Sequence, residues 1–67
     1  SDNFTSSLNG VLTSFTLTHT PSPVAAISLY FNGLAQVYNT HFTVSGTTVT
    51  TNFTPLAGDN LVAIYPY

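Results

Sequence analysis

The feature that most constrains this fold is the dipeptide Asn32-Gly33, which separates two apolar, strand-like runs. Both residues tolerate positive φ, and the type I′ turn that they form matches the right-handed twist of the flanking strands. A two-residue loop also fixes which residues face each other across the hairpin. Apolar side chains then lie on both faces, so we expect this hairpin at the centre of a small sheet, with its second face partly covered. The predicted pairs are Phe31 with Leu34, Leu29 with Gln36 and Ile27 with Tyr38 on one face, and Tyr30 with Ala35 and Ser28 with Val37 on the other.

A second hairpin is predicted over residues 41–53, with its turn at Ser45-Gly46. This register places Phe42 opposite Val49 on the inner face. Threonines occupy the outer face, where β-branched side chains suit a half-exposed strand.

Two further strands are predicted on either side of these hairpins. Residues 13–19 alternate between apolar and polar side chains, as in a half-buried strand, until Pro21-Ser22-Pro23 ends the run. After a turn that contains Gly58, residues 61–65 form a continuous apolar run, which is typical of a central strand covered on both faces. No segment has helical periodicity. We therefore expect an all-β chain, a small antiparallel β-sandwich or partly open barrel of about five to six short strands.

The length of 67 residues allows one domain. We expect residues 1–12 to be a polar N-terminal arm, with at most a short strand at Phe4-Thr5, and residues 13–67 to be a single β domain. A chain of this size buries only about 60% of the surface that its unfolded form exposes, so its core is marginal. It has no cysteine for a disulfide, and two histidines are too few for a structural metal site. Association with copies or with a larger assembly is the remaining source of stability.

The charge pattern excludes several classes of partner. The chain has no Lys and no Arg, and its only acidic side chains are Asp2 and Asp59. Without cations it cannot neutralise phosphates, so we expect no nucleic-acid partner and no attraction to an anionic membrane. No apolar run approaches the roughly 18 residues of a membrane span, and no basic segment precedes an apolar one, so we expect neither a transmembrane helix nor an intact signal peptide in these residues. Contacts with a partner must be apolar, aromatic and hydrogen-bonded.

Catalytic and metal-binding patterns are absent from the sequence. There is no Gly-x-Ser-x-Gly nucleophile elbow. Asp2 lies in the expected arm and Asp59 in a turn, where a carboxylate commonly accepts hydrogen bonds from its own backbone. His19 and His41 are expected at strand ends, and they can share a metal only if their strands are neighbours or if three copies meet. We therefore expect a chain that is not an enzyme, with no catalytic residue, no metal and no cofactor.

Two sets of side chains remain as candidate contact or modification sites. Tyrosine offers a large contact area with a polar tip, and the four tyrosines can form either a sugar-stacking platform or an interface. They are Tyr30, Tyr38, Tyr65 and Tyr67. Asn3 and Asn52 each begin an Asn-x-Thr sequon, which matters only on a secretory route that glycosylates.

Four motifs follow one another along the chain: Ser-Phe-Thr-Leu-Thr-His-Thr-Pro at 14–21, Leu-Tyr-Phe-Asn-Gly-Leu-Ala-Gln at 29–36, His-Phe-Thr-Val-Ser-Gly-Thr-Thr-Val-Thr at 41–50, and Pro-Leu-Ala-Gly-Asp-Asn-Leu-Val-Ala-Ile-Tyr at 55–65. In this order they resemble the small β modules of bacteriophage tail fibres, baseplate-associated proteins and other virion appendages. The resemblance covers about four fifths of the chain. Modules of that family usually have an acidic residue followed by Tyr at the positions of His41-Phe42, and they commonly carry Lys or Arg.

The resemblance implies a non-enzymatic virion module of a tail fibre or capsid decoration, often repeated or trimeric, at the virion surface or outside the cell. Its implied partners are copies of itself, other virion proteins and a host surface glycan. The motif residues then have structural roles, as turn formers at Asn32, Gly33, Ser45, Gly46 and Gly58. Two alternatives remain open: a carbohydrate-binding domain that uses the tyrosines, and a subunit of an extracellular filament whose N-terminal arm adds a strand to its neighbour.

Overall fold

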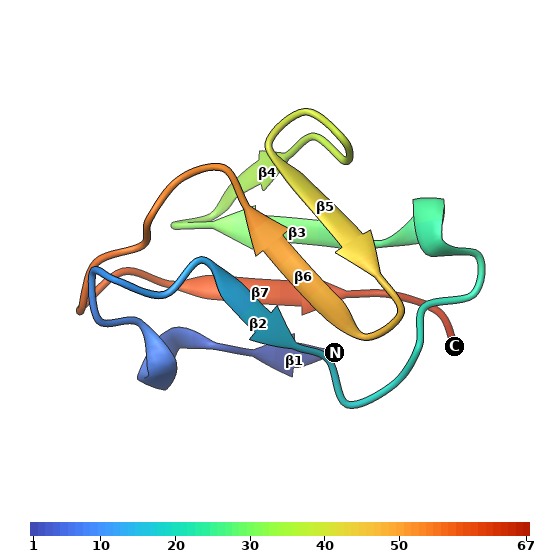
Figure 1. The fold of residues 1–67 in the computed structure, drawn as a ribbon, viewed down its shortest axis with the longest axis horizontal. Helices are drawn as coiled ribbons and strands as arrows, with labels where there is room; N and C mark the ends of the chain where they lie inside the picture. Colours follow the sequence, from blue (N-terminus) through green and yellow to red (C-terminus); the bar gives the residue numbers. More distant parts are fainter.

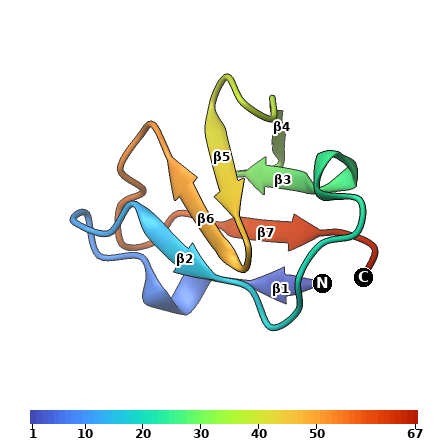
Figure 2. The same ribbon diagram turned by 45° about the vertical axis from the view of Figure 1, so that its right-hand side comes forward.

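Two antiparallel sheets pack face to face in the computed structural model, which describes residues 1–67 (Figures 1 and 2). Sheet A has the strand order β1-β7-β3-β4 and sheet B the order β2-β6-β5. The arrangement confirms the predicted antiparallel β-sandwich and is not a closed barrel. The strands are β1 (Asp2–Asn3), β2 (Ser14–Thr16), β3 (Ser28–Phe31), β4 (Leu34–Gln36), β5 (Phe42–Ser45), β6 (Thr48–Thr51) and β7 (Leu61–Ile64). Single 3-10 turns, η1 (Thr5–Ser7) and η2 (Val24–Ala26), are the only helical elements.

The β3–β4 hairpin has the predicted turn and register. Asn32 and Gly33 both have positive φ, 52° and 81°, as a type I′ turn requires. Three of the five predicted pairs are observed: Leu29 with Gln36, Tyr30 with Ala35, and Phe31 with Leu34. The other two pairs do not form, since β4 ends at Gln36 and Tyr38 bridges to Phe42 instead. The hairpin also does not occupy the centre of the sheet, because β4 is an edge strand.

The β5–β6 hairpin turns one residue later than predicted. Its central residues are Gly46 and Thr47, and Ser45 pairs with Thr48 as the last residue of β5. Only Gly46 has positive φ in this turn, 60°, which is the pattern of a type II′ turn with Gly at its first central position. Each partner moves by two residues, so the faces are unchanged and Val49 lies opposite Val44 instead of Phe42.

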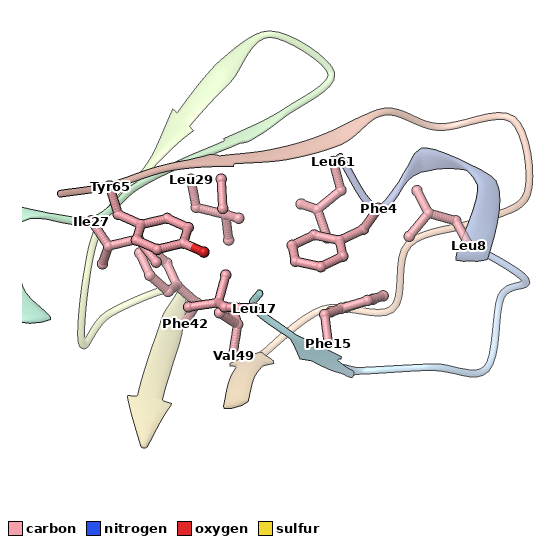
Figure 3. Packing of buried hydrophobic residues seen from close by; sticks show 11 residues of the cluster. Phe4, Leu8, Phe15, Leu17, Ile27, Leu29, Phe42, Val49, Leu61 and Tyr65 are labelled. Atoms are coloured by element: carbon pink, nitrogen blue, oxygen red, sulfur yellow. The ribbon is translucent and has the colours of Figure 1, made fainter. Parts of the chain in front are cut away.

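The N-terminal segment packs onto its own domain, in contrast to the free arm that the polar sequence suggested. β1 pairs with β7 through Asp2 and Asn3, two residues earlier than the expected strand. The turn η1 then directs Phe4 and Leu8 into the core, where the Phe4 ring lies 5.4 Å from that of Phe15. Two apolar side chains in an otherwise polar segment thus pack at one end of the core (Figure 3).

The core lies between the sheets. Figure 3 shows Leu29, Leu61 and Tyr65 from sheet A and its extension facing side chains of sheet B. Leu29, Val49, Leu61 and Ala63 are completely inaccessible to solvent. The buried apolar residues are Phe4, Leu8, Phe15, Leu17, Ile27, Leu29, Phe42, Val49, Leu61, Ala63 and Tyr65.

We expect Leu29→Ala to destabilise the domain by about 2–5 kcal/mol, because it removes buried methyl groups and leaves a cavity between the sheets. Leu34→Ala is the matched control: Leu34 lies in the same hairpin but is 69% exposed, so its loss should change the free energy of unfolding by less than about 0.5 kcal/mol. Urea unfolding followed by circular dichroism measures both values. Equal losses from the two variants would contradict the placement of the core.

Candidate interaction surface

The outer face of sheet A is apolar. Paired residues point to the same side of a sheet, so the register places one row of side chains across all four strands: Asn3, Val62, Tyr30 and Ala35. Ile64 and Ser28 form the next row, on the two central strands. Ile64 is 51% exposed, and Val62 and Tyr30 are half-buried. We call these six residues the apolar face.

The outer face of sheet B has the opposite character. Its outward residues are all exposed, and every one is Ser or Thr. They form two rows of three across the strands, Ser14-Thr50-Thr43 and Thr16-Thr48-Ser45, and we call them the hydroxyl face. Hydroxyl groups are readily hydrated, so this face needs no cover, whereas the apolar face leaves hydrocarbon in contact with water.

Strand β7 shows why the apolar face is notable. Its continuous apolar sequence predicted a central strand covered on both faces. The strand is indeed central, since it pairs with β1 and β3. Only one side is covered, however: Leu61 and Ala63 are buried against sheet B, while Val62 and Ile64 point to solvent. The sequence of β7 is therefore typical of a strand that is buried on both faces, but the fold buries only one of them.

Neither acidic side chain belongs to the apolar face. Asp2 points to the inner side of β1, in register with buried Ala63. Asp59 lies in the turn before β7, where one of its oxygens accepts a hydrogen bond from the Leu56 N–H at 2.9 Å, the backbone role expected from the sequence. The apolar face thus has no charged group.

Asp2 instead holds the two sheets together at one edge. The Thr18 hydroxyl donates to one carboxylate oxygen at 2.9 Å, and the other oxygen accepts from the Thr18 N–H and the Tyr65 hydroxyl. Burial by itself raises the pKa of Asp2, but the hydrogen bonds from Tyr65 and Thr18 outweigh this effect and hold the pKa below its ordinary value of 3.8. Asp2 and Tyr65 are far apart in the sequence, so no local pattern could have revealed this contact.

The two histidines occupy separate structural positions. The His19 ring stacks on Tyr67 with the ring centroids 3.7 Å apart, and the backbone N–H of His19 donates to the Tyr65 hydroxyl oxygen. His41 closes the loop between β4 and β5, because its Nδ1 accepts from the Val37 N–H at 2.9 Å. No group of three or more side chains of the kinds that bind metals lies close together.

The four tyrosines do not gather into one platform. Tyr30 lies on the apolar face, and Tyr38 packs by its edge on Phe42 near the β4–β5 loop. Tyr65 is buried, with its hydroxyl bound to Asp2, and only Tyr67, at 67% exposure, projects into solvent beside it. The structure therefore offers no row of aromatic rings on which a glycan chain can stack.

The predicted turn residues also link the two connections at one end of the sandwich. The Asn60 N–H donates to the Asn32 side-chain oxygen at 2.8 Å, and the Asn32 side-chain amide donates to Asp59 at 3.2 Å. Gly58 lies in the same turn as Asp59. The Asn32-Gly33 turn thus orients the loop that leads into β7, a contact that the sequence did not predict.

The remaining features describe the surface as a whole. No enclosed pocket is present. No helix has the length and hydrophobicity that a membrane span requires. Both sequon asparagines are exposed, although the Asn52 side chain donates to the Thr40 carbonyl oxygen. Eight large apolar side chains are exposed, and Ile64 is the one of them that belongs to the apolar face. The apolar face is distinguished instead by its position, because it lies across the two central strands, β7 and β3.

Comparison with protein-family models, with curated proteins and with solved structures found no match to this chain.

We expect acid to remove the stabilisation that ionised Asp2 contributes. Because the folded-state pKa lies below the ordinary value, the contribution is complete well above pH 3.8 and is lost as the pH falls through the folded-state pKa. Thermal unfolding of the wild type and of Asp2→Asn, from about pH 7 to about pH 2, measures it. The wild type should melt higher at neutral pH, and the difference should close in acid. A difference that is constant with pH would show that the charge of Asp2 is irrelevant.

Proposed function

We propose that this chain is a non-enzymatic structural module of a bacteriophage virion appendage, a tail fibre or capsid decoration, which assembles by burying its apolar face against a protein neighbour. The single observation that carries this proposal is the open apolar side of the central strand β7, opposite a sheet whose outer face is entirely Ser and Thr. The order of the four sequence motifs supports the virion context.

The energetics favour an assembled state. Only 14 of the 67 residues are buried, so the isolated domain has a small core. Burial of apolar surface contributes roughly 25 cal/mol per Å², and the apolar face supplies such surface without a buried charge or an unpaired carboxylate. A module of this kind gains stability when it assembles, which suits a repeated component of a large particle.

The two alternative functions receive less support from the geometry. A carbohydrate-binding domain needs several exposed aromatic rings on one surface. Tyr30 and Tyr38 lie apart from the Tyr65–Tyr67 pair, in which Tyr65 is buried. A filament that grows by strand addition needs a free N-terminal strand, whereas β1 pairs with β7 of its own chain.

We expect the purified chain to associate as its concentration rises, and Ile64→Asp to remain monomeric. The substitution places a charge on the central strand of the apolar face, where association would have to bury it. Sedimentation velocity over a wide concentration range, together with light scattering, measures the mass of each variant.

Thr50→Asp is the matched control, because Thr50 points outward from the middle strand of sheet B, on the hydroxyl face. It introduces the same charge and should associate like the wild type. Circular dichroism confirms that both variants are folded. A wild type that stays monomeric at millimolar concentration, or equal loss of association in both variants, would refute the proposed use of the apolar face.

A further inference from the structure

The charges of the chain restrict what can cover the apolar face. A protein partner with an ordinary charged surface would have to strip water from its charges, and this chain has no Lys or Arg to pair with an acid. A second apolar face brings no charge to the contact, since Asp2 and Asp59 both lie elsewhere. We infer that the occupant of the apolar face is a second copy of this chain, packed face to face about a two-fold axis. This inference rests on the proposed function, because it names the partner of the same surface.

The pattern of large and small side chains on the face is self-complementary. On the two central strands, Tyr30 pairs with Val62 and Ser28 pairs with Ile64. A two-fold axis that runs between the two copies, across the strands and midway between these pairs, places Tyr30 of one copy over Ser28 of the other. The same axis places Val62 over Ile64. Each large ring thus meets a small side chain, and the contact is isologous, as in most two-fold dimers.

Face-to-face packing of sheets is the arrangement that already holds the domain together. Aligned sheets pack about 10 Å apart with their strands within about 30° of each other, and outward side chains interdigitate between them. In the dimer, two copies of sheet A form the inner layers and the two hydroxyl faces remain in water. Val62 and Ile64 are then covered, and β7 acquires the two-sided burial that its sequence predicts.

The size of the face sets the strength of the dimer. A standard interface buries about 800 Å² on each partner, which is roughly a fifth of the 3784 Å² accessible surface of this chain. The outward side chains of strands only two to four residues long supply less than this. We therefore expect a weak dimer, with a dissociation constant in the micromolar to millimolar range, which becomes stable when many copies are held together.

Single-cysteine variants test the geometry, because the chain has no cysteine of its own. Ser28→Cys places a thiol on the apolar face, and Ser14→Cys places one on the hydroxyl face of sheet B. Both changes are nearly isosteric and lie at exposed strand positions. At a concentration where the wild type associates, a soluble maleimide should modify Ser28→Cys several-fold more slowly than at high dilution, because the second copy covers residue 28. Ser14→Cys should react equally fast at both concentrations. Sedimentation equilibrium should fit a monomer–dimer model.

The outcomes separate this inference from the proposed function. Association into trimers or larger species, or protection of Ser14→Cys in place of Ser28→Cys on association, would overturn the two-fold pairing while the module still assembles. A chain that does not associate alone, but binds a different virion protein through the apolar face, would also overturn the pairing and leave the proposed function standing. Absence of any association or partner binding through this face would overturn both.

Discussion

The structure depends above all on the position of β7 between β1 and β3. Through these two ladders the last strand of the chain joins the first strand to the central hairpin. The Phe4 N–H extends the β1–β7 ladder by donating to the Leu61 carbonyl oxygen at 2.8 Å. Since β7 also supplies Leu61 and Ala63 to the core, neither the N-terminal segment nor the hairpin has a complete environment before β7 docks. Pairing between strands so far apart in the sequence closes long loops, which slows folding.

The residues in the turns predicted much of this fold. They did not decide between two positions for the second turn, and they could not predict contacts between residues distant in the sequence. Asn32-Gly33 strongly favours one kind of turn, type I′, so the turn and the register of its hairpin were both predicted correctly. Ser45-Gly46-Thr47 allows Gly at either central position, and only the observed φ of Gly46 decides between them. The strand at Asp2 was missed because a polar stretch with two apolar residues resembles a mobile terminus. Neither its sheet partner nor its contact with Tyr65 has any local signature.

The sequence predicted only part of the candidate interaction surface. The register of the central hairpin predicted apolar side chains on both of its faces, and the apolar run at 61–65 predicted a strand that is covered on both faces. What the sequence could not supply is the topology, which places Tyr30 beside Val62 and leaves that side open. The tyrosines illustrate the same limit, since composition counts aromatic rings but the fold distributes them among a core, a loop and two surfaces.

The hydroxyl face has a consequence for the conditions under which such a module works. Its affinity for water comes from neutral groups, and the contact that we propose for the opposite sheet is also neutral, so ionic strength has almost nothing to screen on either side. Sulfate and phosphate, which are excluded from protein surfaces, favour the burial of hydrocarbon. An assembly of such modules should therefore be at least as stable at high salt concentration as at low salt concentration.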